Sequence, residues 1–118
     1  MSYLLLLLVG SCKKENKLFV LRDDTGIKFE NTLDYTEDFN PYTYRNFYNG
    51  AGVSVGDINN DGLIDIYITG NIVPNKLYLN LGNFKFLDIT NQAGVACENV
   101  WSTGSALVDI NGDGLLDI

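Results

Sequence analysis

The hydrophobic residues of this 118-residue chain fall into short runs with a period of two, which is the spacing of strands. In 75–81 polar and apolar residues alternate, and Gly82-Asn83 then indicates a tight hairpin turn. Only 91–96 has a helical pattern, and that for one turn at most. We therefore predict an all-β chain with four short antiparallel strands, at 53–55, 66–69, 76–81 and 84–89.

The folded part is predicted to begin at 18–29 with a strand and a turn at Asp24-Thr25-Gly26. A similar phrase recurs at 86–95. The distance between these two phrases is about sixteen residues longer than the distance between the two copies of the motif described next. We assign the excess to an insertion at 30–49, which is rich in Tyr and Phe and turns at Asn40-Pro41. Such a segment either binds a ligand through its rings or covers the core of the first unit.

A nine-residue motif occurs at 57–65 and again 52 positions later at 109–117. Each copy has oxygen-bearing side chains at its first, third, fifth and ninth places and glycine at its sixth. Calcium takes about six to eight oxygen ligands, and a backbone carbonyl at the seventh place would add to the side chains. The predicted metal ligands are Asp57, Asn59, Asp61, Leu63 and Asp65 in the first copy, and Asp109, Asn111, Asp113, Leu115 and Asp117 in the second.

Three carboxylates in each copy repel one another, by about 4 kcal/mol per pair at 4 Å and an effective dielectric near 20. The alternative is an Asn-Asp-Gly hairpin turn with solvated carboxylates, and the repetition of the whole pattern argues against it. The motif is not an EF-hand, because its twelfth place is Ile68 and its flanks are strand-like. Calcium is the predicted cofactor, and magnesium is the weaker candidate because it demands stricter octahedral geometry.

Composition limits the possible functions. A net charge of −7 argues against nucleic acid or an anionic membrane as the main partner. The chain has no histidine, which removes the commonest general base and any Cys–His nucleophile within it. Cys97 is therefore predicted to be a small buried residue and not a reactive thiol.

The N-terminus resembles a secretory signal, because the apolar run Leu4–Val9 ends at Gly10-Ser11-Cys12 and charged residues follow. Val9–Cys12 is similar to a bacterial lipobox, which implies a signal peptide at 1–11, lipidation of Cys12 and a tether at 12–17. The expected location is the bacterial outer membrane or cell surface, reached by secretion across the inner membrane and held by the lipid alone. No basic residue precedes the apolar run, which departs from such signals, and a buried strand or short core helix is the alternative.

The segment Gly52–Ile66 resembles an FG-GAP/VCBS repeat, the calcium-loop blade of integrin-α-type β-propellers. The phrase at 77–95 is similar to the ASPIC/UnbV and cartilage-acidic-protein-like group. The resemblance covers 18–118 and implies a first unit at 18–69 and a truncated second unit at 70–118. That amounts to about one and a half four-stranded blades of a larger propeller with roughly six to eight blades.

The resemblance implies a non-catalytic, calcium-binding module of a cell-surface lipoprotein, which binds an extracellular protein or glycan ligand or serves in adhesion. One alternative is an accessory or N-terminal part of a glycan-degrading enzyme, for which a carboxylate pair outside the two motifs would be needed. Another is a structural module that assembles through an exposed strand edge.

Overall fold

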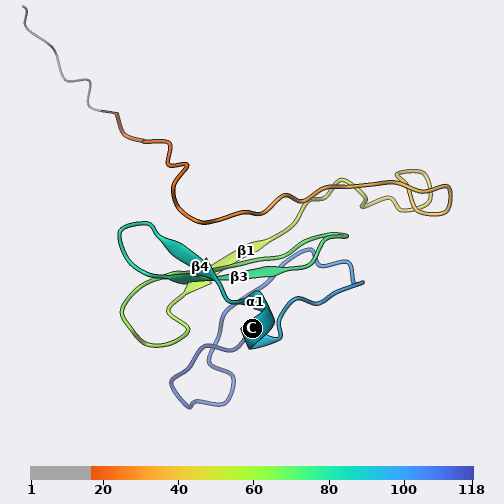
Figure 1. Cartoon of the computed structure of the whole chain (residues 1–118). Coiled ribbons are helices and arrows are strands. Elements are labelled where there is room, and N and C mark those ends of the chain that lie inside the picture. Colours follow the sequence, from red (N-terminus) through yellow and green to blue (C-terminus); the bar gives the residue numbers. More distant parts are fainter. Residues whose placement is uncertain (1–16) are drawn as a thin grey trace, which may run out of the picture.

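The computed structural model describes residues 17–118, so the predicted signal peptide, Cys12 and most of the tether lie outside the described residues. Four strands form one antiparallel sheet in the order β1-β2-β3-β4 (Figure 1). The strands are β1 at Val53–Gly56, β2 at Asp65–Ile68, β3 at Lys76–Asn80 and β4 at Phe86–Asp88. One helical turn, α1 at Thr90–Ala93, follows. The predicted all-β class and all four strands are confirmed.

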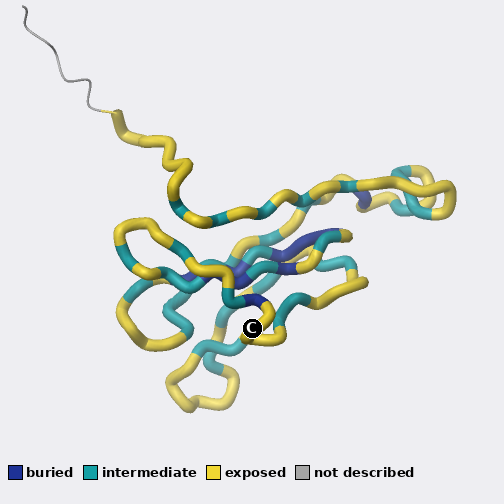
Figure 2. Tube along the Cα trace, viewed as in Figure 1, coloured by how far each residue is buried: buried dark blue, intermediate teal, exposed yellow. Residues whose placement is uncertain are grey.

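The buried residues lie mainly on β2, on β3 and in the turn between them (Figure 2). Tyr67, Leu77 and Tyr78 form the apolar part of this core. Polar residues complete it, and their groups are paired: Asn75 accepts the backbone N–H of Gly70 and donates to the Tyr67 hydroxyl. A buried polar group without such a partner would cost free energy, so these bonds make a partly polar core possible.

Two segments differ from the predicted elements. Residues 18–22 do not form a strand, and Leu18, Phe19 and Leu21 are more than 90% exposed. The apolar run has no neighbouring strand to supply ladder hydrogen bonds, and the chain's first backbone hydrogen bond to the sheet is the one in which the Thr25 carbonyl accepts the N–H of Phe86. The last strand begins at Phe86 and not at Phe84, because Phe84 has a φ of 59° and belongs to the hairpin turn.

The sheet crosses the boundary between the two units predicted at 69–70, since β1 and β2 precede that point and β3 and β4 follow it. The hydrogen-bonded sheet therefore does not coincide with either of the two predicted units. Residues 102–108 run beside β1, and the hydroxyls of Ser54 and Ser105 lie 2.8 Å apart there. None of the helical segments described at 17–118 has the length and apolar character required to cross a membrane.

Insertion 30–49 lies away from the sheet (Figure 1) and packs mainly on itself and on Trp101. The Phe47 side chain is fully buried, and its ring centre is 5.4 Å from that of Phe39 and 5.7 Å from that of Trp101. Buried Asn71 holds this region in place by donating to the carbonyls of Gly50 and Ser102. The insertion thus forms an aromatic cluster of its own with Trp101, and both predicted roles, ligand binding and covering of the core, stay predictions.

Candidate functional site

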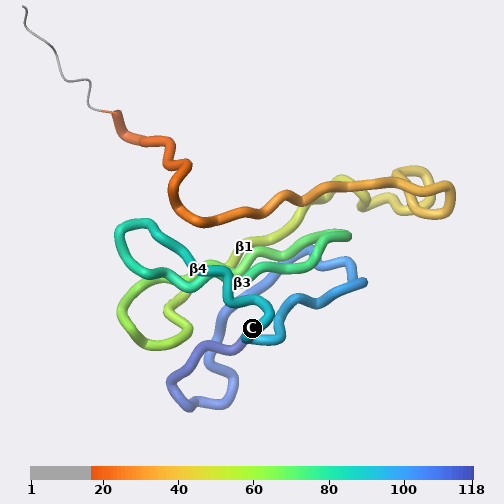
Figure 3. Tube along the Cα trace, in the orientation of Figure 1, coloured from red at the N-terminus to blue at the C-terminus, as the bar shows by residue number. Residues whose placement is uncertain are grey.

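The first motif forms the connection between β1 and β2, because Gly56 pairs with Asp65 at the end of that ladder. The second motif is closed in the same register, by an antiparallel bridge between Val108 and Asp117. Figure 3 shows both loops projecting from the same end of the fold, the first in light green and the second in blue. A loop at 57–64 is far longer than the two-residue turn of a tight hairpin.

The first place of each motif organises the loop backbone. The Asp57 carboxylate accepts the N–H groups of Asp61 at 3.1 Å and Gly62 at 2.7 Å. Asp109 accepts the equivalent groups at 3.1 and 2.9 Å. The sixth-place glycines have φ values of 83° and 85°, which glycine adopts without the strain of a Cβ atom. Both loops therefore wrap around their first aspartate.

The third and fifth places face each other in both loops. Asn59 Oδ1 accepts the Asp61 N–H at 3.1 Å, and Asn59 Nδ2 donates to Asp61 Oδ2 at 2.9 Å. Asp61 Oδ1 in turn accepts the N–H of Leu63 at 2.8 Å. The corresponding bonds recur in the second loop. The hydrogen bond from the Leu115 N–H, and to a smaller extent that from Asn111, lowers the pKa of Asp113 below its ordinary value.

The ninth place is the most buried part of the motif. Asp65 is fully buried, with Oδ2 accepting the N–H of Ile58 at 3.0 Å and Oδ1 that of Asn80 at 2.7 Å. Asp117 accepts the N–H of Ile110 at 3.1 Å. The ninth carboxylate thus ties the start of the loop to its end, and in the first copy it also binds β3.

Within residues 17–118, no three acidic, cysteine or histidine side chains converge closely enough to hold a metal ion by themselves. A cation in either loop would therefore also need the amide oxygen of the third place and the carbonyl of the seventh. The amide N–H of Asn59 now contacts the Asp61 carboxylate, the kind of position that a cation would take. The donor set consists only of oxygens, which fits a hard cation such as calcium, so the ten predicted ligands stay a prediction consistent with this geometry.

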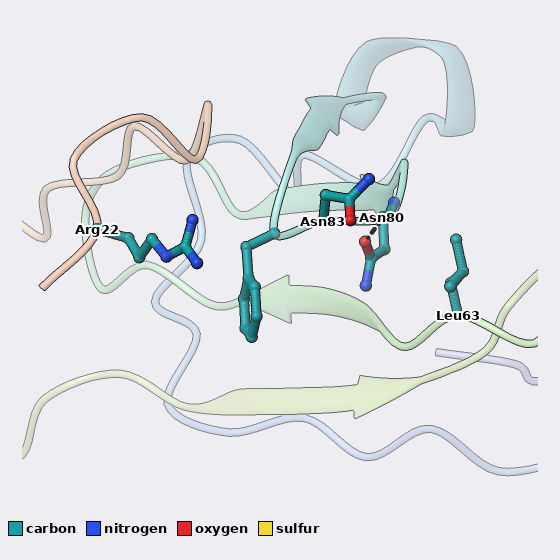
Figure 4. Close-up of a pocket in the computed structure, with 6 residues that line it drawn as sticks. Arg22, Leu63, Asn80 and Asn83 are labelled. Carbon is teal, nitrogen blue, oxygen red and sulfur yellow. Dashed lines mark hydrogen bonds between the residues drawn. The ribbon is translucent and has the colours of Figure 1, made fainter. Parts of the chain in front are cut away.

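A hollow of about 480 Å³ lies beside the first loop (Figure 4). The Arg22 guanidinium lies 5.4 Å from the centre of the Phe84 ring, within the range of a cation–π contact. On the other side, Asn80 is committed to the turn, accepting the N–H of Gly82 and donating to the Ile64 carbonyl. This hollow is an open surface depression whose wall includes Leu63, the seventh place of the first loop.

The nine-place motif does not single out Asn60, which lies in the first loop and contacts the second. Asn60, at the fourth place, donates from Nδ2 to the Gly114 carbonyl at 3.0 Å and so joins the two loops. The signal available in the sequence was that the two copies differ there, with Gly112 at the equivalent place. The prediction for Cys97 was wrong, because this residue is exposed. It lies in the irregular segment after α1 with a φ of 47°, and its Sγ contacts the Tyr67 hydroxyl from the surface.

The model of the FG-GAP-like repeat family matches residues 57–118, which includes both loops and everything between them. The chain belongs to the FG-GAP-like repeat family. It is also 42% identical over 69 residues to cartilage acidic protein 1 of Mus musculus, a match that covers 58% of this chain and 11% of that protein. The homologues of Xenopus tropicalis and Homo sapiens are 39% and 41% identical over the same length. No solved structure matches the chain.

Membership in this family indicates which larger fold the sheet belongs to. The blade of a β-propeller is a four-stranded antiparallel sheet whose strands follow one another in sequence, and β1–β4 have this arrangement. The chain between 104 and 117 begins the next repeat, since the Val108–Asp117 bridge matches the Gly56–Asp65 pair of the first. The matched stretch spans about a tenth of the length of these curated relatives.

Proposed function

We propose that this chain is part of a non-catalytic, calcium-binding β-propeller module at a cell surface, where it binds an extracellular protein or glycan. The observation that carries the proposal is the equivalence of the two loops. Asp57 and Asp109 each accept the N–H groups of the fifth and sixth places of their loops, and Asp109 also accepts that of Gly112. A repeated arrangement of side-chain and backbone oxygen atoms is what cation coordination requires, and solvated hairpin loops have no need of it.

Calcium would act by stabilising the fold. Each cation would be held by the five predicted places of its loop and would relieve the repulsion between that loop's carboxylates. Because the first loop connects β1 and β2, a cation bound there would stabilise the paired ends of both strands. Binding to the folded state alone raises the free energy of unfolding by about 2.7 kcal/mol when calcium is at a hundred times its Kd.

The proposal that the module is non-catalytic draws on two acidic residues outside the loops. Asp24 is paired with Lys85 and Asp88 with Lys76, at 2.6 and 2.8 Å. Carboxylates held by lysines serve structure better than acid–base catalysis, for which a pair of carboxylates with separated pKa values is needed.

Thermal unfolding in EDTA and in calcium, with magnesium as the comparison, tests the calcium proposal. We expect calcium to raise the Tm of the wild type by several degrees and magnesium to raise it less. The double variant D57A/D109A should lose this response, whereas D34A, which removes an exposed acid outside the loops, should keep it. Equal Tm values for the wild type in EDTA and in calcium would reject calcium binding.

We further propose that Cys12 carries the lipid that anchors the protein. Its support is the sequence pattern alone, an apolar run followed by Gly10-Ser11-Cys12 and then by charged residues. Metabolic labelling with a fatty acid in a bacterial host should label the wild type and leave C12A unlabelled. C97A is the matched control, since it removes the other cysteine of the chain and should keep the label.

A further inference from the structure

The two loops are joined by a hydrogen bond between residues 54 positions apart in the sequence. Asn60 Nδ2 in the first loop donates to the backbone carbonyl of Gly114 in the second, at 3.0 Å. Across the part of the chain that the structure describes, it is the one hydrogen bond found between the loops. This bond is therefore the direct polar link between the backbones of the two loops.

The Asn60 side chain is not required by the local backbone. Asn60 has a φ of 59°, and Gly112 at the equivalent place of the second loop has a φ of 75°. Both are left-handed conformations, which glycine adopts at lower cost than asparagine. Glycine would therefore satisfy the first loop equally well, and what asparagine adds is the amide that reaches Gly114.

The peptide that Asn60 contacts belongs to the core of the second loop. The Gly114 N–H donates to Asp109 Oδ2 at 2.9 Å, and the following N–H, that of Leu115, donates to Asp113 Oδ1 at 2.8 Å. The donor from Asn60 thus fixes the orientation of the 114–115 peptide plane and polarises it toward Asp113. The seventh-place carbonyl of Leu115 comes immediately after this plane.

We propose that Asn60 is a positioning residue for the second loop, and that through it cation binding in the first loop strengthens cation binding in the second. This inference rests on the proposed calcium function. A cation held by Asn59 and Asp61 would immobilise the residue between them, and the amide of Asn60 would then hold the 114–115 peptide in place. Because coupling between sites is reciprocal, the second cation strengthens binding of the first by the same factor. A single hydrogen bond supports an effect of about two- to tenfold in affinity.

Calcium titration calorimetry on four forms of the chain tests the coupling. D57A empties the first loop, so the affinity that remains is that of the second loop, and N60G and N60G/D57A repeat the comparison without the amide. We expect D57A to weaken the second loop about two- to tenfold when Asn60 is present and to leave it unchanged when residue 60 is glycine. If Asn60 only supported the structure of the second loop, N60G would weaken calcium binding there to the same extent whether or not the first loop binds calcium.

The variant G112N serves as a matched control, because it places the same amide at the fourth place of the other loop. No atom lies within 4 Å of a Cβ added at Gly112, and although the φ of 75° there costs asparagine some backbone strain, the coupling should equal that of the wild type. Suppose that both loops bind calcium but D57A changes the affinity of the second loop equally with Asn60 and with glycine at residue 60. That result would overturn this inference and leave the proposed function intact. A wild type that binds no calcium would overturn both.

Discussion

Asp65 Oδ1 accepts the backbone N–H of Asn80 at 2.7 Å, which joins the last place of the first loop to the end of β3. Asp65 is fully buried, and its second oxygen accepts the N–H of Ile58. The residue predicted as a metal ligand is therefore also an anchor between the loop and the sheet. This anchor gives the first loop a role in folding that does not depend on a cation.

Replacing Asp65 should destabilise the chain even without calcium. D65A leaves the N–H groups of Ile58 and Asn80 without their acceptor, and we expect a loss of about 2–3 kcal/mol in the free energy of unfolding. Urea unfolding in EDTA measures it. D117A removes the equivalent carboxylate, which accepts the more exposed N–H of Ile110, and should cost less than about 1 kcal/mol. Equal losses for the two variants would contradict the anchoring role.

The aromatic cluster of the insertion should contribute strongly to stability. Phe47 is fully buried against Phe39 and Trp101, so F47A creates a cavity and should cost about 3–5 kcal/mol. Tyr42 is in the same insertion but fully exposed, and Y42A should change stability by less than about 0.5 kcal/mol. Chemical denaturation of both variants compares them, and similar values would mean that the insertion does not pack on Trp101 in solution.

The ion pair between Asp88 and Lys76 predicts a dependence of stability on pH. Burial alone would raise the pKa of Asp88, but hydrogen bonds from Lys76 and Thr90 outweigh it and lower the pKa to about 2. A carboxyl whose pKa is lower in the folded state stabilises the fold above its unfolded pKa and loses that contribution as the pH falls through the folded one. The pair is partly exposed, so the contribution should be at most about 1 kcal/mol and should disappear between about pH 4 and pH 2.

The variant D88N measures this contribution. Its stability should fall less steeply than that of the wild type over this pH range, because residue 88 no longer titrates. Unfolding curves at stepped pH values in constant salt compare the two proteins. A pH dependence of D88N parallel to that of the wild type would assign the acid sensitivity to other carboxyl groups.

The turn after β2 should accept no side chain at Gly70. A Cβ atom there would collide with the Val73 carbonyl oxygen, so G70A must displace the backbone of a buried turn. We expect a loss of about 2 kcal/mol or more, read from thermal unfolding. Gly104 is the control, because an added Cβ meets no atom within 4 Å there and G104A should be close to neutral.

The strands and the two loops were predictable because their signals are local. Alternation in 75–81 and the repeated nine-place motif depend on residues near each other in sequence, and β3 and the Gly56–Asp65 closure follow from them. The strand predicted at the start of 18–29 failed because strand formation also needs a partner, and a run of apolar residues carries no information about one.

By itself the sequence determined the fold class, the family pattern and the positions of the candidate ligands, since each rests on periodicity or on repeated spacing. Only the tertiary structure decided that Asp65 is buried against β3, that Trp101 joins the rings of the insertion, and that Asn60 reaches Gly114. These contacts join residues from 15 to 62 positions apart, and their existence depends on how the sheet and its loops place distant backbone atoms. No local pattern encodes that placement.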